Sequence, residues 1–154
     1  ETFIIYNNNT INKLHGFYFD QLNIGMNAFF SKTITNSDVT LFAGISGDTN
    51  PVHLNVEFAS TTRFKDRIVH GMLTASLIST VIGTKLPGPG SIYVNQNLRF
   101  KAPVLIGQTA TAFVEVVNIL IKKQIVELKT ICKVKGKIVL DGEAAVLVPE
   151  RNLN

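Results

Sequence analysis

Two side chains that can do acid–base chemistry, Asp48 and His53, stand five positions apart in this sequence. Pro51 stiffens the segment between them, so the two side chains can be aimed at one point. A carboxylate and an imidazole that share one water molecule form a general acid–base pair. The segment therefore supports the hypothesis of a site that activates water.

On spacing alone, other interpretations of the pair stay open. Asp48 could be a turn residue that follows a helix, and His53 could be an ordinary surface histidine. A metal site would need a third ligand at a recognisable spacing, and the sequence shows none, so we predict no metal. A Ser–His–Asp triad is poorly supported, because Gly44–Gly47 is one residue short of the Gly-x-Ser-x-Gly elbow.

A helix is predicted immediately before the pair. Thr35 and Asp38 match the Ser/Thr-x-x-acid pattern of a helix start, and apolar residues then follow at helical spacing. Gly47 ends the pattern, as glycine often does just past a helix. Upstream, the run from Met26 to Thr35 predicts a strand.

The pair itself lies in a segment with irregular backbone signals. Pro51 pushes Asn50 away from helical geometry, so we predict that residues 48–53 are not regular helix. A short helix is expected after them, with Asn55 as its cap and its end near Thr61.

The clearest helix prediction covers Gly71 to about Lys85, where apolar residues occupy most of the circumference, as in a buried helix. The segment Leu86–Gly90 then breaks the chain. Four extended runs separated by turn residues follow: 91–101, 109–120, 124–134 and 137–148. Helices early and strands late predict the α+β class, with an antiparallel sheet packed on one long helix.

The bulk composition is that of one globular domain. The chain has 154 residues, of which 45% are hydrophobic and 17% charged, a balance that argues against disorder. Its net charge of +4 is mild and scattered, so we expect no nucleic-acid partner. No apolar run reaches the ~18 residues that span a membrane, so we expect no membrane partner and a cytoplasmic or organellar-matrix location. The single cysteine, Cys132, is expected to be a buried, inert thiol.

Several motifs, in order along the chain, resemble the MaoC-like dehydratases and (R)-specific enoyl-CoA hydratases. They are Phe19–Gly25, Phe42–His53, Arg67–Leu73, Pro87–Tyr93 and Arg99–Val104. The resemblance covers roughly residues 19–148, so we expect one domain over residues 19–150. Residues 1–18 are expected to be a loosely structured lead.

The resemblance implies a hot-dog fold, in which an antiparallel sheet wraps around a long central helix, and a homodimer. It also implies trans-2-enoyl-CoA or enoyl-acyl-carrier substrates, with water added to give a (3R)-3-hydroxyacyl thioester. No metal or redox cofactor is implied, because coenzyme A enters as part of the substrate.

The resemblance also implies roles for individual residues. Asp48 and His53 are the catalytic pair, and the backbone N–H of Gly71 stabilises the developing oxyanion. Ser79 matches a serine that assists at the site in some members. Together with Ile82 and Val146 it also matches positions that line the acyl-tail end of the tunnel, and the bulk of Ile82 predicts a short-chain preference of about four to six carbons. As alternatives, Ser79 would belong to a stripe of small residues that allows close packing, and Ile82 would be plain core.

Other functions remain as alternatives. The same site could serve a 3-hydroxyacyl-carrier-protein dehydratase. A hot-dog thioesterase would share the sheet and helix, although the Asp48–His53 segment argues against it. A non-catalytic acyl-thioester-binding module of a larger enzyme is a further hypothesis, which an intact catalytic pair disfavours.

Overall fold

The computed structural model describes residues 11–151 of the chain. The structure begins with a short 3-10 helix, η1 (Phe19–Gln21), and strand β1 (Asn27–Thr33). Four helices follow: α2 (Asn36–Ser46), α3 (Pro51–Leu54), α4 (Val56–Thr61) and α5 (Gly71–Thr84). The second half holds strands β2 (Ile92–Phe100), β3 (Thr109–Leu120), β4 (Ile125–Val134) and β5 (Lys137–Leu147), with η2 (Ile121–Lys123) before β4. The α+β class and the four late strands are confirmed.

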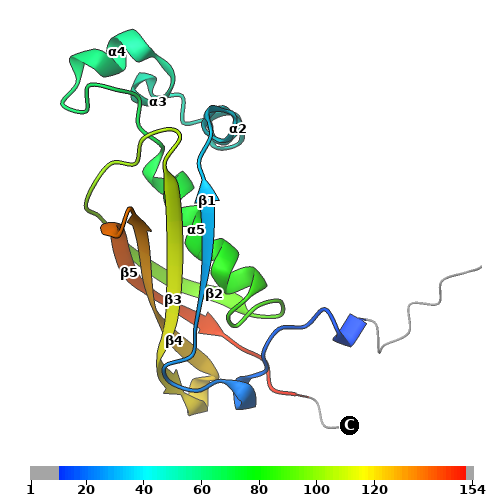
Figure 1. Cartoon of the computed structure of the whole chain (residues 1–154). Helices are drawn as coiled ribbons and strands as arrows, with labels where there is room; N and C mark the ends of the chain where they lie inside the picture. Colours follow the sequence, from blue (N-terminus) through cyan, green and yellow to red (C-terminus); the bar gives the residue numbers. More distant parts are fainter. Residues whose placement is uncertain (1–10, 152–154) are drawn as a thin grey trace, which may run out of the picture.

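The strands form one antiparallel sheet in the order β1-β3-β4-β5-β2. Along β3 and β4, every second side chain is buried toward α5, which packs against β1, β3 and β4. Figure 1 shows the long, twisted sheet with α5 lying across one face, and α2, α3 and α4 gathered beyond one end of the sheet. Asp48 lies between α2 and α3, and His53 lies in α3, so the predicted pair is at this end of the sheet.

Helix α5 is the centre of the hydrophobic core, as predicted. Leu77, Ile78, Val81 and Ile82 are all less than 5% exposed and face the sheet. The opposite side is open along most of its length, because Met72, Ser76, Ser79 and Gly83 are exposed. Burial is thus one-sided in the single chain, and the sequence pattern did not distinguish the covered side from the open one.

The local signals around α2 are confirmed. The Thr35 side chain accepts a hydrogen bond from the Asp38 backbone N–H at 3.2 Å, and the Asp38 carboxylate accepts one from the Thr35 N–H at 2.8 Å. Gly47 ends the helix in the left-handed region, with φ of 77°.

The segment that holds the pair differs from the prediction in its second half. Residues 48–50 are irregular as expected, but Pro51–Leu54 form the one-turn helix α3, so His53 is helical. Pro51 occupies the first turn, where backbone N–H groups make no hydrogen bond within the helix, so the lack of an N–H in proline costs nothing there. The prediction that 48–53 excludes helix was therefore wrong for its last residues. Asn55 caps α4 as predicted, since its side chain accepts from Phe58 N–H at 2.9 Å.

The expected lead is covered only in part, since residues 1–10 lie outside the described residues. The N–H groups of Gly16 and Phe17 donate to the carbonyls of Pro89 and Pro87, both at 2.8 Å. These contacts fasten the end of the lead to the loop after α5. The domain boundary at residue 18 stays a prediction.

Two further expectations concern Cys132 and membranes. Cys132 is buried in β4, and burial raises the pKa of its thiol to about 12, which suits an inert group. Within residues 11–151, every helix is too short or too polar to traverse a lipid bilayer.

Candidate active site

The loop between α2 and α3 holds the carboxylate of Asp48. Its Oδ1 accepts a hydrogen bond from Asn50 N–H at 3.2 Å, and the Asp48 N–H donates to Ser46 Oγ at 3.1 Å. Asn50 in turn caps α3, because its Oδ1 accepts from Val52 N–H at 3.1 Å. These short-range bonds shape the loop and leave Asp48 exposed. Within residues 11–151 the second carboxylate oxygen, Oδ2, makes no hydrogen bond, so it can bind water.

His53 lies in α3 and is only 7% exposed, so the surface-histidine alternative is wrong. Its Nδ1 is 2.7 Å from the carbonyl oxygen of Ile68. Since a carbonyl can only accept, Nδ1 carries the proton and Nε2 keeps a free lone pair. Burial lowers the pKa of His53 below its usual value, while the hydrogen bond to Ile68 opposes that effect. This tautomer leaves Nε2 suited to accept a proton.

The two predicted catalytic side chains lie close together. One donor or acceptor atom from each of Asp48, His53 and His70 lies within 4.8 Å of the other two. A single water molecule can therefore touch both the Asp48 carboxylate and His53.

His70 brings a possible third metal ligand that spacing did not reveal. Its ring stacks on His53, with centroids 3.8 Å apart and planes inclined by 30°. Imidazole lone pairs lie in the ring plane, so stacked rings do not point at a shared ion. The arrangement favours an acid–base pair over a metal centre.

Helix α5 starts at Gly71, next to the pair. The first N–H groups of a helix have no partner inside it and form a partially positive end. A methyl group at position 71 would come within 2.8 Å of the Phe100 ring, so a glycine fits the space beside this helix start. A carbonyl oxygen can approach the backbone N–H at this position, and the oxyanion role of Gly71 stays a prediction.

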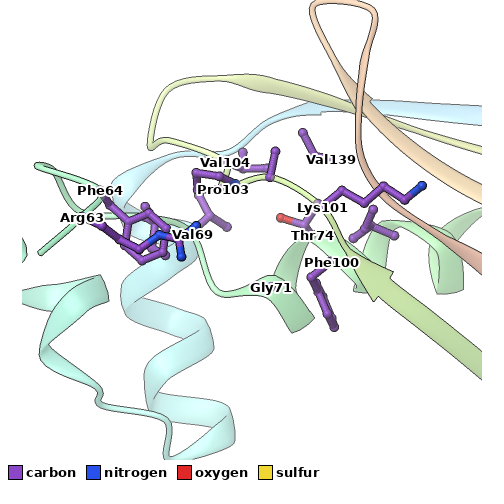
Figure 2. A pocket seen from close by; sticks show the side chains of 13 residues that line it. Arg63, Phe64, Val69, Gly71, Thr74, Phe100, Lys101, Pro103, Val104 and Val139 are labelled. Atoms are coloured by element: carbon purple, nitrogen blue, oxygen red, sulfur yellow. The ribbon is translucent and has the colours of Figure 1, made fainter.

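A cavity of about 300 Å³ reaches the start of α5, and it is shown in Figure 2. Figure 2 shows Gly71 and Thr74 on the helix, with Phe100 and Lys101 beside them and Arg63 and Phe64 at the far end. The cavity includes Gly71 but not Asp48 or His53. Its residues are Arg63, Phe64, Ile68, Val69, Gly71, Thr74, Phe100, Lys101, Ala102, Pro103, Val104, Val139 and Leu140.

The three predicted tail-binding residues have different surroundings. Ile82 is 2% exposed and Val146 0% exposed, and both belong to the main core, whereas Ser79 lies on the open side of α5. Burial suits both hypotheses for Ile82, because a tail pocket and a plain core are equally apolar. The tail-binding role of these residues stays a prediction.

Two polar groups near the site were not predicted as functional: the sequence suggested His70 only as a structural residue that orients the turn before Gly71, and it did not single out Thr74. His70 contacts both members of the pair. Thr74 lines the cavity, is only 2% exposed, and has a hydroxyl without a hydrogen-bond partner among the described residues. No spacing rule marks His70, which precedes a helix start and lies 17 positions beyond His53. A histidine directly before a glycine that opens a long apolar helix was the only local sign.

A sheet that holds one long helix is the hot-dog architecture, and the Asp–His pair beside the start of that helix is its candidate acid–base site. The chain belongs to the MaoC-like domain family, whose model matches residues 22–142. The resemblance found in the sequence is therefore confirmed.

Individual relatives agree with this assignment. The chain is 56% identical over 134 residues to an (R)-specific enoyl-CoA hydratase of Rhodospirillum rubrum, which covers 87% of this chain and 93% of the relative. It is 46% identical over 139 residues to a 3-hydroxybutyryl-CoA dehydratase of Methylorubrum extorquens, covering 90% and 88%. The solved R-hydratase of Pseudomonas aeruginosa superposes with a TM-score of 0.82 at 45% identity, covering 87% of this chain and 86% of that one. The hot-dog expectation is confirmed.

Proposed function

We propose that this protein catalyses the reversible hydration of trans-2-enoyl-CoA to (3R)-3-hydroxyacyl-CoA. The observation that carries the proposal is the placement of Asp48 and His53 beside each other and near the start of α5. Such a site can activate water and stabilise a negative oxygen at once. Relatives whose names specify an (R)-specific enoyl-CoA hydratase and a 3-hydroxybutyryl-CoA dehydratase support the substrate class and the (R) product.

The first step of the proposed reaction is polarisation of the thioester. The carbonyl oxygen accepts a hydrogen bond from the Gly71 N–H, and the positive end of α5 favours the negative charge that grows on it. This charge withdrawal makes C3 of the enoyl chain electrophilic. Glycine allows the thioester to approach the backbone closely.

Water then attacks C3 while it is held by the catalytic pair. In this proposal Asp48 Oδ2 accepts one water hydrogen, and His53 Nε2, which keeps its lone pair because Nδ1–H donates to Ile68, accepts the other. As the oxygen bonds to C3, one of the two residues takes the water proton and the π electrons move onto the thioester as an enolate. The pair then returns a proton to C2, which restores the thioester carbonyl, completes the addition of H and OH, and leaves Asp48 and His53 in their starting protonation states. Water and the thioester suffice, with no metal or redox cofactor.

A homodimer is part of the proposal. Strand β2 is an edge of the sheet, and it exposes Ile92, Tyr93 and Val94. An edge of this kind presents unpaired backbone groups and apolar side chains that a second copy can cover. Light scattering at micromolar concentration should give about twice 16.9 kDa. A stable, active monomer contradicts this part of the proposal.

The function is tested by following the enoyl-thioester absorbance with crotonyl-CoA and longer enoyl-CoAs, with chiral analysis of the product. Loss of the band with formation of the (3R) alcohol supports the proposal. Release of a free thiol from a saturated acyl-CoA would indicate a thioesterase instead. Enoyl groups on an acyl-carrier protein, assayed side by side, test the carrier-protein alternative.

A further inference from the structure

The side chain of His70 is buried between the parts of the site and is not used to cap its own helix. His70 is the N-cap residue of α5, yet its ring makes no capping hydrogen bond. His70 is 1% exposed, and its Nε2 donates to the main-chain carbonyl of Asp48 at 2.9 Å. A buried histidine is thus directed across the site, to a residue 22 positions earlier in the chain.

This hydrogen bond is the one that ties the Asp48 loop to α5. In the part of the chain that the structure describes, residues 47–50 otherwise hydrogen-bond only within residues 43–53. Those internal bonds define the shape of the loop, but they do not set its place relative to α5. The bond from His70 does, because residue 70 immediately precedes the first residue of that helix.

The ring of His70 also supports His53. Helix α3 has only four residues, and a helix that short is not stable by itself. The position of His53 therefore depends on contacts with the rest of the chain: its hydrogen bond to Ile68 and its stacking on His70 at 3.8 Å. Phe42 of α2 contacts the same His70 ring, with centroids 4.9 Å apart. One side chain thus connects α2, the Asp48 loop, α3 and the start of α5.

We infer that His70 is a positioning residue that holds Asp48 and His53 in register with the N–H groups at the start of α5. The inference rests on the proposed function, since hydration needs water and the oxyanion donor at a set separation. A displacement of about 1 Å in such a site can lower the rate by about 10²-fold.

Two nearly isosteric substitutions separate the hydrogen bond from the ring. His70→Gln keeps an N–H donor near the place of Nε2, whereas His70→Met has no donor, and both lack the ring. We expect kcat of His70→Met to fall by up to ~10²-fold, with KM little changed, and His70→Gln to recover at least ~10-fold of that loss. If His70→Met does not fold, His70→Phe takes its place as the donor-free variant.

The matched control is Val81→Ala, which removes two methyl groups from the buried side of the same helix, away from the pair. It should lower the melting temperature and leave kcat near that of the wild type. Equal kcat values for the Gln and Met variants overturn the inference. So does a raised KM at unchanged kcat, because that result would make His70 a substrate contact.

A second measurement separates this inference from the proposed function. Amide hydrogen exchange at residues 47–50 should be faster in His70→Met than in His70→Gln, whatever reaction the protein catalyses. A wild type that hydrates no enoyl thioester would overturn the proposed function while leaving the exchange result to decide whether His70 holds the loop. Unchanged exchange in both variants overturns the positioning role.

Discussion

The two halves of α5 differ in how tightly they are packed and in whether the buried polar atoms beside them are hydrogen-bonded. At the N-terminal end, Gly71 adjoins a cavity, and His70 Nδ1 and Thr74 Oγ1 are buried without a hydrogen-bond partner among the described residues. At the C-terminal end, Ile78, Val81 and Ile82 are at most 2% exposed and pack tightly on the sheet. Buried polar groups without hydrogen-bond partners destabilise a fold, so their presence at this end of the helix calls for an explanation such as a functional role.

Under the proposed function, the C-terminal half of α5 anchors the fold and the N-terminal end carries the chemistry. Substitutions at the C-terminal half should act mainly on stability, and those at the N-terminal end mainly on rate.

The largest effect is expected from the pair beside the N-terminal end. Asp48→Asn and His53→Ala should each lower kcat by ~10²–10⁴-fold, because each removes a group that contacts the attacking water. Asp48 is exposed, so its substitution should leave the melting temperature near the wild-type value. Enoyl-CoA hydration and thermal unfolding are measured together, with Asp20→Asn as an exposed carboxylate outside the site. Near-full activity in a folded variant contradicts the assignment.

The next effect concerns the anchoring half. Ile82→Ala should lower the free energy of unfolding by ~2–5 kcal/mol, because it leaves a cavity in a closely packed core. If Ile82 also bounds the acyl tail, kcat/KM for eight-carbon relative to four-carbon enoyl-CoA should rise, since each newly buried methylene contributes up to ~0.8 kcal/mol.

The control for Ile82 is Val81→Ala, which lies next to it on the same buried side. It should destabilise the protein without changing the chain-length ratio. An unchanged ratio in Ile82→Ala would show that Ile82 is plain core.

A smaller effect is expected from Gly71→Ala. The new methyl would come within 2.8 Å of Cε1 of Phe100, the far edge of a ring that is 54% exposed and can move. Stability should therefore change little. The fall in kcat/KM should be smaller than the ~10²–10³-fold that follows the loss of an oxyanion donor, because the N–H of residue 71 remains. The added methyl only narrows the space through which the thioester carbonyl reaches that N–H. Adding Phe100→Ala should remove the contact between the new methyl and the Phe100 ring, but it should not restore kcat/KM. Recovery of the rate in the double variant would place the defect at Phe100 instead of at the N–H.

The smallest effect is a pH dependence. Burial lowers the pKa of His53, so the folded protein takes up the proton at a lower pH than the unfolded chain does. The free energy of unfolding contributed by neutral His53 is therefore fully present above the pKa of the unfolded chain, ~6.5. It is lost as the pH falls through the lower pKa that His53 has in the folded protein.

The acid limb of kcat/KM should accordingly lie below pH ~6.5. Melting temperatures between pH 5 and 8, compared with those of His53→Gln, should show a slope in the wild type that the variant lacks. A half-maximal activity at or above pH 6.5 would contradict this prediction.

Much of the fold could be predicted because its signals are local. The Thr35–Asp38 capping box, Gly47 as helix end and Asn55 as cap are formed by residues that are neighbours along the chain. The apolar periodicity of α5 and the late strands is likewise readable without knowledge of the partners. Pro51 was misjudged, because proline excludes helix before it and permits helix from its own position onward.

The sequence by itself also determined the composition of the pair and its place in a stiff segment, and the resemblance added the family. Only the tertiary structure decided that His53 is buried with its Nδ1 proton directed at Ile68, and that His70 joins the Asp48 loop to α5. It also decided that β2 is an edge and that one side of α5 is open. These features are contacts between residues far apart in the chain, and their geometry depends on how the whole sheet and helix pack, so no local pattern encodes them.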